Sequence, residues 1–518
     1  MYPITRRHCL KTFGSMSLLA LDTGFLWANK SAETLRHIPL QVGKAPDLLP
    51  ESGLTTGFLR FGWKAFAVGN AEGETSHLLG LGDAAPDVPD DAICRLRLTN
   101  AIDIRDAYDI EVSTPGGQLI GRFDLRYAGL YQVQEIPLSP SQARAVLAQG
   151  AVLHMRSGGK PVWFFAPSPG ASPAPDPVQL PHLLIATPGG DPAAAFEQRL
   201  RGRVMLQGFG WQSGCVSEGM LDLAELRRDA AILDAVDRYL AMYFTDRGVV
   251  FENPRSQLLR DEVGGIEEPL PWATLARRQP AHPALEIARA FLVSDAVNKH
   301  DLSRGQALTT EGNYTAAYPS AVLSRVLNLP ELATLALRQL EARRLACVHE
   351  GDIYQRAAMG GRHSRLRNWC RGVCWYYLGM VRTLEALGDE NVIASWLPEI
   401  RRVAAFLRLH QRADGLWGNV IHDPQSAVDT SGSAGLAAAL ARDQAAGWRI
   451  RTANPRRPAQ PPYSRWPARR RRPEQQGRQR PPARRLPRDL PNGHGIEGAV
   501  ARGVGSLVDN CMNLMKFV

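Results

Sequence analysis

The spacing of apolar residues changes near residue 200, and this change limits the folds open to the chain. Between about residues 38 and 190, apolar and polar residues alternate in short runs such as CRLRLTN (94–100), YDIEVST (108–114) and AVLHMRS (151–157), which Gly, Pro, Asp and Ser separate. A period of two in short runs is typical of strands with one buried face. We therefore expect an antiparallel β-sandwich over residues 38–200.

Beyond about residue 217 the apolar residues recur every three or four positions instead. Leu233, Val236, Leu240, Tyr243 and Phe244 form one such stripe, and four further stripes follow before residue 446. This period is that of amphipathic helices, and roughly nine helices fit here in hairpin-like succession. The pattern predicts a multidomain chain in which the sandwich precedes an all-α toroid over residues 218–441.

The positive charge of the chain is concentrated near its C-terminal end. The whole chain carries a formal net charge of +10, whereas residues 442–491 contain 15 Arg and three acidic residues, a net charge of +12. The remainder carries −2, so its charge indicates no nucleic-acid partner. No helical or strand periodicity survives the prolines of the basic segment, and we expect an Arg/Pro-rich disordered tail over residues 442–518.

Residues 1–32 resemble a twin-arginine export signal. Arg6 and Arg7 precede an apolar run that is too short to span a membrane, although Asp22 interrupts that run. We expect a periplasmic or secreted protein that has no membrane partner after export.

Three stretches bring aromatic, arginine and hydroxyl residues together at junctions between loops and helices. The common nucleotide, esterase and zincin motifs are absent, and the seven scattered Cys show no metal-ligand spacing, so we expect no metal or other cofactor. The stretches are NWCRGVCWYYLG, QRADGLWGNV and SAVDTSGSAGLAAAL, and their candidate substrate-binding residues are Trp369, Arg371, Trp375, Trp417, Thr430, Ser431 and Ser433.

Such a set of side chains suits an acidic oligosaccharide as the partner. Aromatic faces stack on sugar rings, and an arginine together with a helix N-terminus binds a carboxylate. The alternative is structural, with Trp375 and Trp417 in the core and with Thr430 or Ser431 as an N-cap. The sequence leaves both interpretations open for each residue taken singly.

The three stretches, in this order and spacing, resemble the glycoside hydrolase 88/105 group of unsaturated glucuronyl and rhamnogalacturonyl hydrolases. The resemblance covers about residues 230–441, and DTSGSA is its most specific element. It implies an (α/α)6 barrel that removes a terminal unsaturated uronic acid from lyase-cleaved polysaccharide. In that group an acidic side chain protonates the C4=C5 double bond, water adds at C5 and no metal is needed.

The same resemblance indicates the catalytic carboxylates. Glu311 in TTEGNYTAAYP stands where the group has Asp, and is the expected proton donor. Glu267 in GGIEEPLP matches an earlier Asp of the group, whereas DIYQRA offers Gln355 and Arg356 in place of a ring-binding His. The alternative for Glu311 is an exposed residue that caps a helix.

Three other functions stay open from the sequence. A polysaccharide lyase needs a base near an arginine, for which Tyr314, Tyr318 and His363 are available. A non-catalytic carbohydrate-binding protein would use the sandwich as its binding module. Nucleic-acid binding by the basic tail would weaken steeply with salt.

The group needs about three more helices after DTSGSA to close its barrel, and this chain becomes Arg/Pro-rich instead. Reading a GC-rich gene out of frame yields Arg, Pro, Ala and Gly. We therefore expect a frameshift near residues 442–450 and a barrel that is incomplete at its C-terminal end.

Overall fold

The computed structural model describes thirteen stretches of the chain, which include most of the predicted sandwich and helical region. They are residues 33–43, 63–69, 75–102, 104, 106–126, 128–157, 160–171, 174–188, 207–245, 248–252, 258–294, 307–358 and 364–448. The predicted export signal and the tail beyond residue 448 lie outside the described residues. Contacts divide the protein into two compact units, with the boundary between Ala288 and Arg289.

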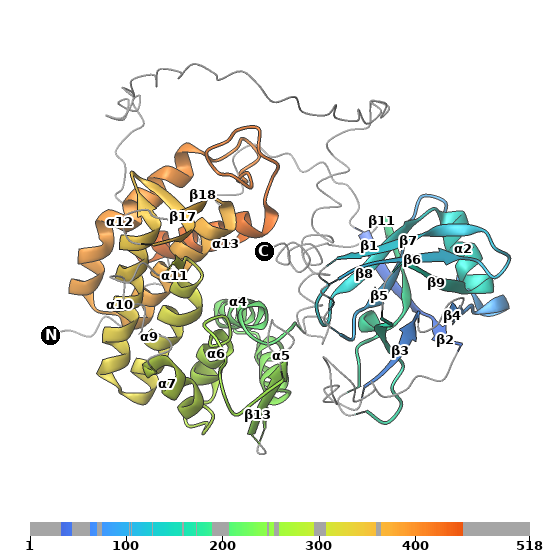
Figure 1. Cartoon of the computed structure of the whole chain (residues 1–518), viewed down its shortest axis with the longest axis horizontal. Helices are drawn as coiled ribbons and strands as arrows, with labels where there is room; N and C mark the ends of the chain where they lie inside the picture. Colours follow the sequence, from blue (N-terminus) through green and yellow to red (C-terminus); the bar gives the residue numbers. More distant parts are fainter. Residues whose placement is uncertain are drawn as a thin grey trace, which may run out of the picture. The chain divides into compact units, whose positions relative to one another are not determined.

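The N-terminal part of the first unit is the expected antiparallel β-sandwich (Figure 1). One sheet has the strand order β1-β11-β5-β8, a second has the order β2-β4-β9-β6-β7, and β3 pairs with β10. The strands are β1 (Glu33–Pro39), β2 (Gln41–Val42), β3 (Lys64–Val68), β4 (Thr75–Leu79), β5 (Ile93–Thr99), β6 (Ala107–Ser113), β7 (Leu119–Arg126), β8 (Val133–Leu138), β9 (Ala151–Ser157), β10 (Val162–Ala166) and β11 (His182–Pro188).

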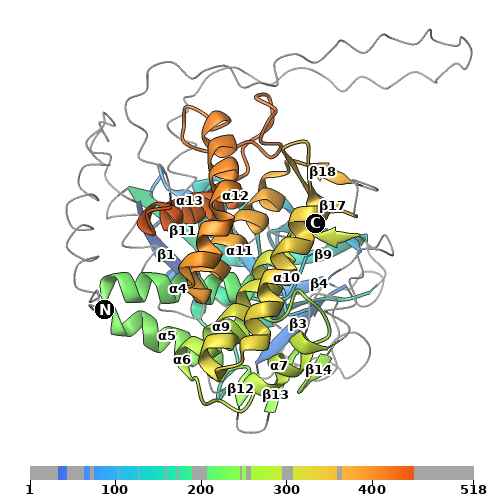
Figure 2. The same cartoon turned by 90° about the vertical axis from the view of Figure 1, so that its left-hand side faces the viewer.

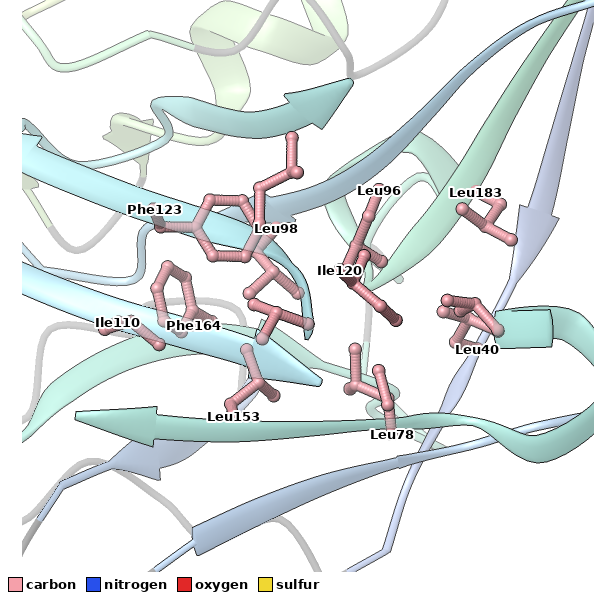
Figure 3. Packing of buried hydrophobic residues seen from close by; sticks show 14 of the residues in the cluster. Leu40, Leu78, Leu96, Leu98, Ile110, Ile120, Phe123, Leu153, Phe164 and Leu183 are labelled. Atoms are coloured by element: carbon pink, nitrogen blue, oxygen red, sulfur yellow. The ribbon is translucent and has the colours of Figure 1, made fainter. Parts of the chain in front are cut away.

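Alternation along these strands supplies the sandwich core (Figure 3). In β6 the side chains of Tyr108, Ile110 and Val112 are buried, whereas the residues between them face outward and carry charge. Leu96, Ile110 and Phe164 of three different strands meet in the same buried cluster. The alternation of apolar and polar residues in the sequence therefore corresponds to the alternation of buried and outward-facing side chains in the strands.

Two short helical segments interrupt the strand order, and the strand pattern did not predict them. They are η1 (Gly82–Ala84) and η2 (Pro177–Gln179). A full helix, α2 (Pro140–Gln149), lies between β8 and β9. Ser139 and Gln142 form a capping box at its start, because each side chain accepts from the other residue's backbone N–H.

The rest of the first unit is helical and carries a small three-stranded sheet. Phe209 stacks on Phe251, with 4.0 Å between ring centroids, and meets Trp272 edge-on. The elements are α4 (Trp211–Arg227), α5 (Ala230–Ala241), β12 (Phe244–Thr245), β13 (Gly248–Glu252), β14 (Leu258–Arg260), α6 (Leu270–Arg278) and α7 (Leu285–Val293), which contains the unit boundary. The helical stripe predicted to include Tyr243 and Phe244 ends earlier, because α5 stops at Ala241.

The second unit consists of helices with short strands between them. In both views α9, α10 and α11 lie side by side (Figures 1 and 2). The elements are β15 (Leu308–Thr309), the π-helix η5 (Asn313–Ala317), α9 (Tyr318–Leu327), α10 (Pro330–Cys347), β16 (Val348–His349), β17 (Asp352–Ala357), β18 (Arg365–Arg367), α11 (Cys370–Leu387), α12 (Glu390–Leu409) and α13 (Thr430–Ala445). The described residues from 207 to 448 thus contain nine α-helices.

Helix α13 continues past the predicted end of the helical region at residue 441. The Arg442 guanidinium donates to Glu385 at 2.5 Å, and the buried Asp443 carboxylate accepts from the Tyr377 hydroxyl. These contacts join α13 to α11, so residues 442–445 belong to this helix and not to the predicted disordered tail.

Candidate active site

Glu311 lies between β15 and the π-helix η5 and is half-buried. The side-chain amide of Gln355, on β17, donates to Glu311 Oε1 at 2.7 Å. Glu311 Oε2 is also buried, but among the described residues it has no hydrogen-bond partner. The carboxylate therefore does not cap a helix: one oxygen is fixed by Gln355, and the other is buried without a hydrogen-bond partner in the described part of the chain and can hold a proton.

The loop that carries Glu311 rests on a buried arginine. Arg343 of α10 is fully buried, and its Nε donates to the carbonyl oxygen of Thr309 at 2.6 Å. A Cβ built on Gly312 would lie 1.7 Å from Arg343 Nη2, so only glycine leaves room for the guanidinium. The EG dipeptide of the sequence is thus explained by contact with Arg343.

A second cluster of polar and aromatic side chains surrounds the N-terminus of α11. The Arg371 guanidinium lies over the Trp369 ring at 4.5 Å from its centroid, and the Trp369 indole donates to Asn419 Oδ1 at 2.9 Å. Arg371 Nε lies 3.3 Å from Asp429 Oδ2. Burial lowers the pKa of Arg371, and the charge of Asp429 opposes this.

Asp429 immediately precedes α13 and is its N-cap residue. Its Oδ1 accepts from the backbone N–H of Gly432 and from the Ser431 hydroxyl, at 2.9 and 2.8 Å. Thr430 Oγ1 is buried and has no hydrogen-bond partner among the described residues. Asp429 Oδ2 is also buried and accepts no hydrogen bond there, although it lies close to Arg371 Nε. The N-cap role proposed for Thr430 or Ser431 therefore belongs to Asp429.

Trp417 and Ser433 are packing residues in this structure. The Trp417 side chain is 2% exposed, and its indole N–H donates to the Leu407 carbonyl at 2.8 Å. The Ser433 hydroxyl is buried and accepts from the Trp417 backbone N–H at 2.9 Å. Neither side chain presents a free face or donor to a sugar, which for Trp417 corresponds to the structural alternative.

Trp375 belongs to a column of stacked side chains. Its ring stacks on Tyr314, which stacks on Tyr318, with centroid separations of 6.0 and 5.7 Å. The Arg382 guanidinium lies over both tyrosines. The tyrosines named for a lyase are therefore buried within this column, and His363 lies outside the described residues.

Direct contacts connect the Glu311 group to the Arg371 group. Gln355, which holds Glu311, packs so closely on Gly372 that a Cβ there would lie 2.8 Å from Gln355 Cβ. Gly372 follows Arg371 at the start of α11, and Arg371 reaches Asp429. Gln355 thus connects Glu311 to the first turn of α11, which contains the buried Arg371.

Glu267 is exposed on the loop before α6, in the first unit. Its neighbour Glu268 is buried instead and accepts from the backbone N–H groups of Gly264 and Gly265 at 2.5 and 3.2 Å. Because Glu267 and Glu311 lie in different compact units, their pairing stays a prediction.

Sequence reasoning missed Arg343, although a signal was present. Leu332, Leu335, Gln339, Arg343 and Cys347 follow one another at helical spacing and are buried on one face of α10. A charged residue on such a stripe is rarely buried without a specific role. In the described part of the chain, no group of His, Cys, Asp and Glu suits a metal ion, and no helix there is long and apolar enough to cross a membrane.

The sequence matches the model of Glycosyl Hydrolase Family 88 over residues 196–454, half of the chain. The chain belongs to this family. It is therefore a glycoside hydrolase, as the motifs around α11 and α13 predicted. No curated protein sequence matches it significantly.

Several solved structures are similar to this family member. One is a possible member of the GH105 family from Salmonella enterica serovar Paratyphi A, with 18% identity over 50% of this chain and 76% of that one, and a TM-score of 0.41. Another is a family 88 glycosyl hydrolase from Bacteroides vulgatus, with 14% identity over 50% and 78% and a TM-score of 0.40. A third is the unsaturated glucuronyl hydrolase of Bacillus sp. GL1, with 17% identity over 47% and 69% and a TM-score of 0.33.

Proposed function

We propose that this glycoside hydrolase removes unsaturated or related uronic acids from the ends of acidic oligosaccharides. The observation that carries the proposal is the half-buried Glu311, whose Oε1 accepts from Gln355 and whose buried Oε2 has no hydrogen-bond partner among the described residues. A general acid needs this arrangement, with a fixed carboxyl group and one oxygen free to hold the proton. Family membership supplies the reaction class, and these residues supply the acid.

Glu311 transfers its proton from Oε2 to C4 of the uronyl double bond in the proposed mechanism. Water then adds at C5 and gives a proton to the Glu311 carboxylate, and the hemiketal that forms opens and releases the remaining chain. Arg371 binds the uronate carboxylate, because its charge is fixed over Trp369 beside the start of α13. The buried Thr430 hydroxyl, which has no hydrogen-bond partner among the described residues, is an additional donor.

The proposal includes the setting of the enzyme. The helical region forms an (α/α)6 barrel that lacks closing helices at its C-terminal end, and the chain is exported to the periplasm or beyond. Its partner is an acidic oligosaccharide, not a nucleic acid or a membrane.

Loss of the enol-ether absorbance of lyase-generated oligosaccharides tests this function. We expect Glu311→Gln to lower kcat by at least about 100-fold, the usual contribution of a general acid, and to leave substrate binding intact. Glu331→Gln, on the exposed side of α10, is the matched control and should retain full activity. Absence of turnover by the folded wild-type protein on every uronide tried would refute the proposal.

A further inference from the structure

A buried positive charge lies directly beneath the loop of the proposed acid. Arg343 is 0% exposed, and its three hydrogen bonds go to neutral oxygens. Nε donates to the Thr309 carbonyl at 2.6 Å, and Nη1 donates to the carbonyl and the side-chain oxygen of Gln339 at 3.1 and 2.6 Å. Among the described residues, no carboxylate accepts a hydrogen bond from this guanidinium.

Burial of such a group is costly, and the cost needs an explanation. Burial lowers the pKa of Arg343 to about 10, so the guanidinium is still charged at neutral pH. Burial also raises the pKa of Cys347 to about 12, so this thiol carries no compensating charge. An apolar side chain is often at least as stable at such a place, which argues that the charge is kept for another reason than stability.

The contacts of Arg343 indicate that reason. Its Nε holds the carbonyl of Thr309, two residues before Glu311, and its Nη2 lies against Gly312, the residue after Glu311. The guanidinium thus touches the backbone on both sides of the acid. Gln355 fixes the side chain of Glu311, whereas Arg343 fixes the backbone that carries it.

We propose that Arg343 is a positioning residue, whose guanidinium sets the backbone of residues 309–312 so that Glu311 reaches the reacting carbon. The inference rests on the proposed function of Glu311. This role requires the planar guanidinium of an arginine at position 343 and a glycine at position 312. A displacement of about 1 Å at a reacting group can cost about 100-fold in rate.

The test compares Arg343→Met, Arg343→Lys and Gly312→Ala with wild type in the enol-ether assay, and thermal unfolding is measured in parallel. We expect Arg343→Met to lower kcat about 100-fold with KM within about threefold of wild type, because substrate contacts are unchanged. Arg343→Lys keeps the charge and one donor, so its kcat should be about tenfold higher than that of Arg343→Met. Gly312→Ala should lower kcat as Arg343→Met does, since its methyl group displaces the guanidinium.

Arg338→Met is the control, because Arg338 is exposed on the same helix. If Arg343→Met folds and keeps the kcat of this control, the inference is overturned. The inference is also overturned if the lower activity of Arg343→Met is explained by a smaller fraction of folded protein. It is overturned as well if the substitution raises KM and leaves kcat unchanged. Failure of the proposed function has a different signature, since then wild type shows no turnover or Glu311→Gln keeps full activity.

Discussion

The packing of α11 on α13 makes a quantitative prediction about the DTSGSAG stretch. Gly435 lies within α13, and a Cβ built on it would lie 2.2 Å from Cys374 Sγ of α11. The next nearest atom is Cys374 Cβ at 3.8 Å, an ordinary contact. The thiol is therefore the only obstacle to a methyl group there among the described residues.

The expected free energies follow from this geometry. Gly435→Ala gains about 1 kcal/mol of helix propensity but overpacks against the thiol at a cost of about 1–3 kcal/mol. In a Cys374→Ala background the obstacle is gone, and the new methyl group fills the space that the sulfur leaves. Gly435→Ala should then stabilise the protein, so the two substitutions couple by about 2 kcal/mol.

Calorimetric unfolding of wild type, both single variants and the double variant measures this coupling. For a unit of this size, 2 kcal/mol corresponds to a difference of about 4–8 °C in the midpoint of the helical transition. Equal effects of Gly435→Ala in both backgrounds, within about 0.5 kcal/mol, would show that the two side chains do not meet. The packing of α11 on α13 described above would then be incorrect.

Two further predictions concern the acid and the pH dependence of stability. Gln355→Leu removes the hydrogen bond to Glu311 Oε1 at nearly constant volume, so kcat should fall by about 10- to 100-fold with KM little changed; an unchanged kcat would contradict the role of Gln355. Burial and then the charge of His422 lower the pKa of His410 from 6.5, so its contribution to stability is present above pH 6.5 and is lost as the pH falls below that value. The wild-type unfolding midpoint should therefore drop more between pH 7.5 and 5.5 than that of His410→Phe, and parallel curves would contradict this.

The sandwich was predictable because the alternation of buried and outward-facing residues in a strand can be recognised within a few consecutive residues of the sequence. YDIEVST was expected as a strand at 108–114 and forms β6 at Ala107–Ser113. The small sheets β12–β14 and β15–β18 were not predicted. Five of their strands have only two or three residues, too few for a readable period, whereas the longer β13 and β17 were missed among the helical pattern. Helix α2 was missed despite a local signal, the Ser139 and Gln142 capping box.

The site was predictable in part, and the reason lies in long-range contacts. The motifs pointed to Glu311 and Arg371, which the structure links through Gln355 at the start of α11. They pointed equally to Trp417 and Ser433, whose polar groups are already used within the protein. A tryptophan or hydroxyl that binds a ligand has the same local sequence as one that packs, because its partner is distant in the chain.

Much of the family motif therefore serves helix packing rather than substrate contact. Gly432 and Gly435 of α13 receive Cys370 and Cys374 of α11, and each pair is so close that a Cβ on the glycine would meet sulfur. This packing sets the distance between the two helices, and with it the 3.3 Å separation of Arg371 from Asp429. The chemistry then depends on few polar atoms, held by glycines and buried side chains that never touch the sugar. A substitution in the motif can thus abolish activity by moving α11, and a loss of activity alone does not identify a residue that binds substrate.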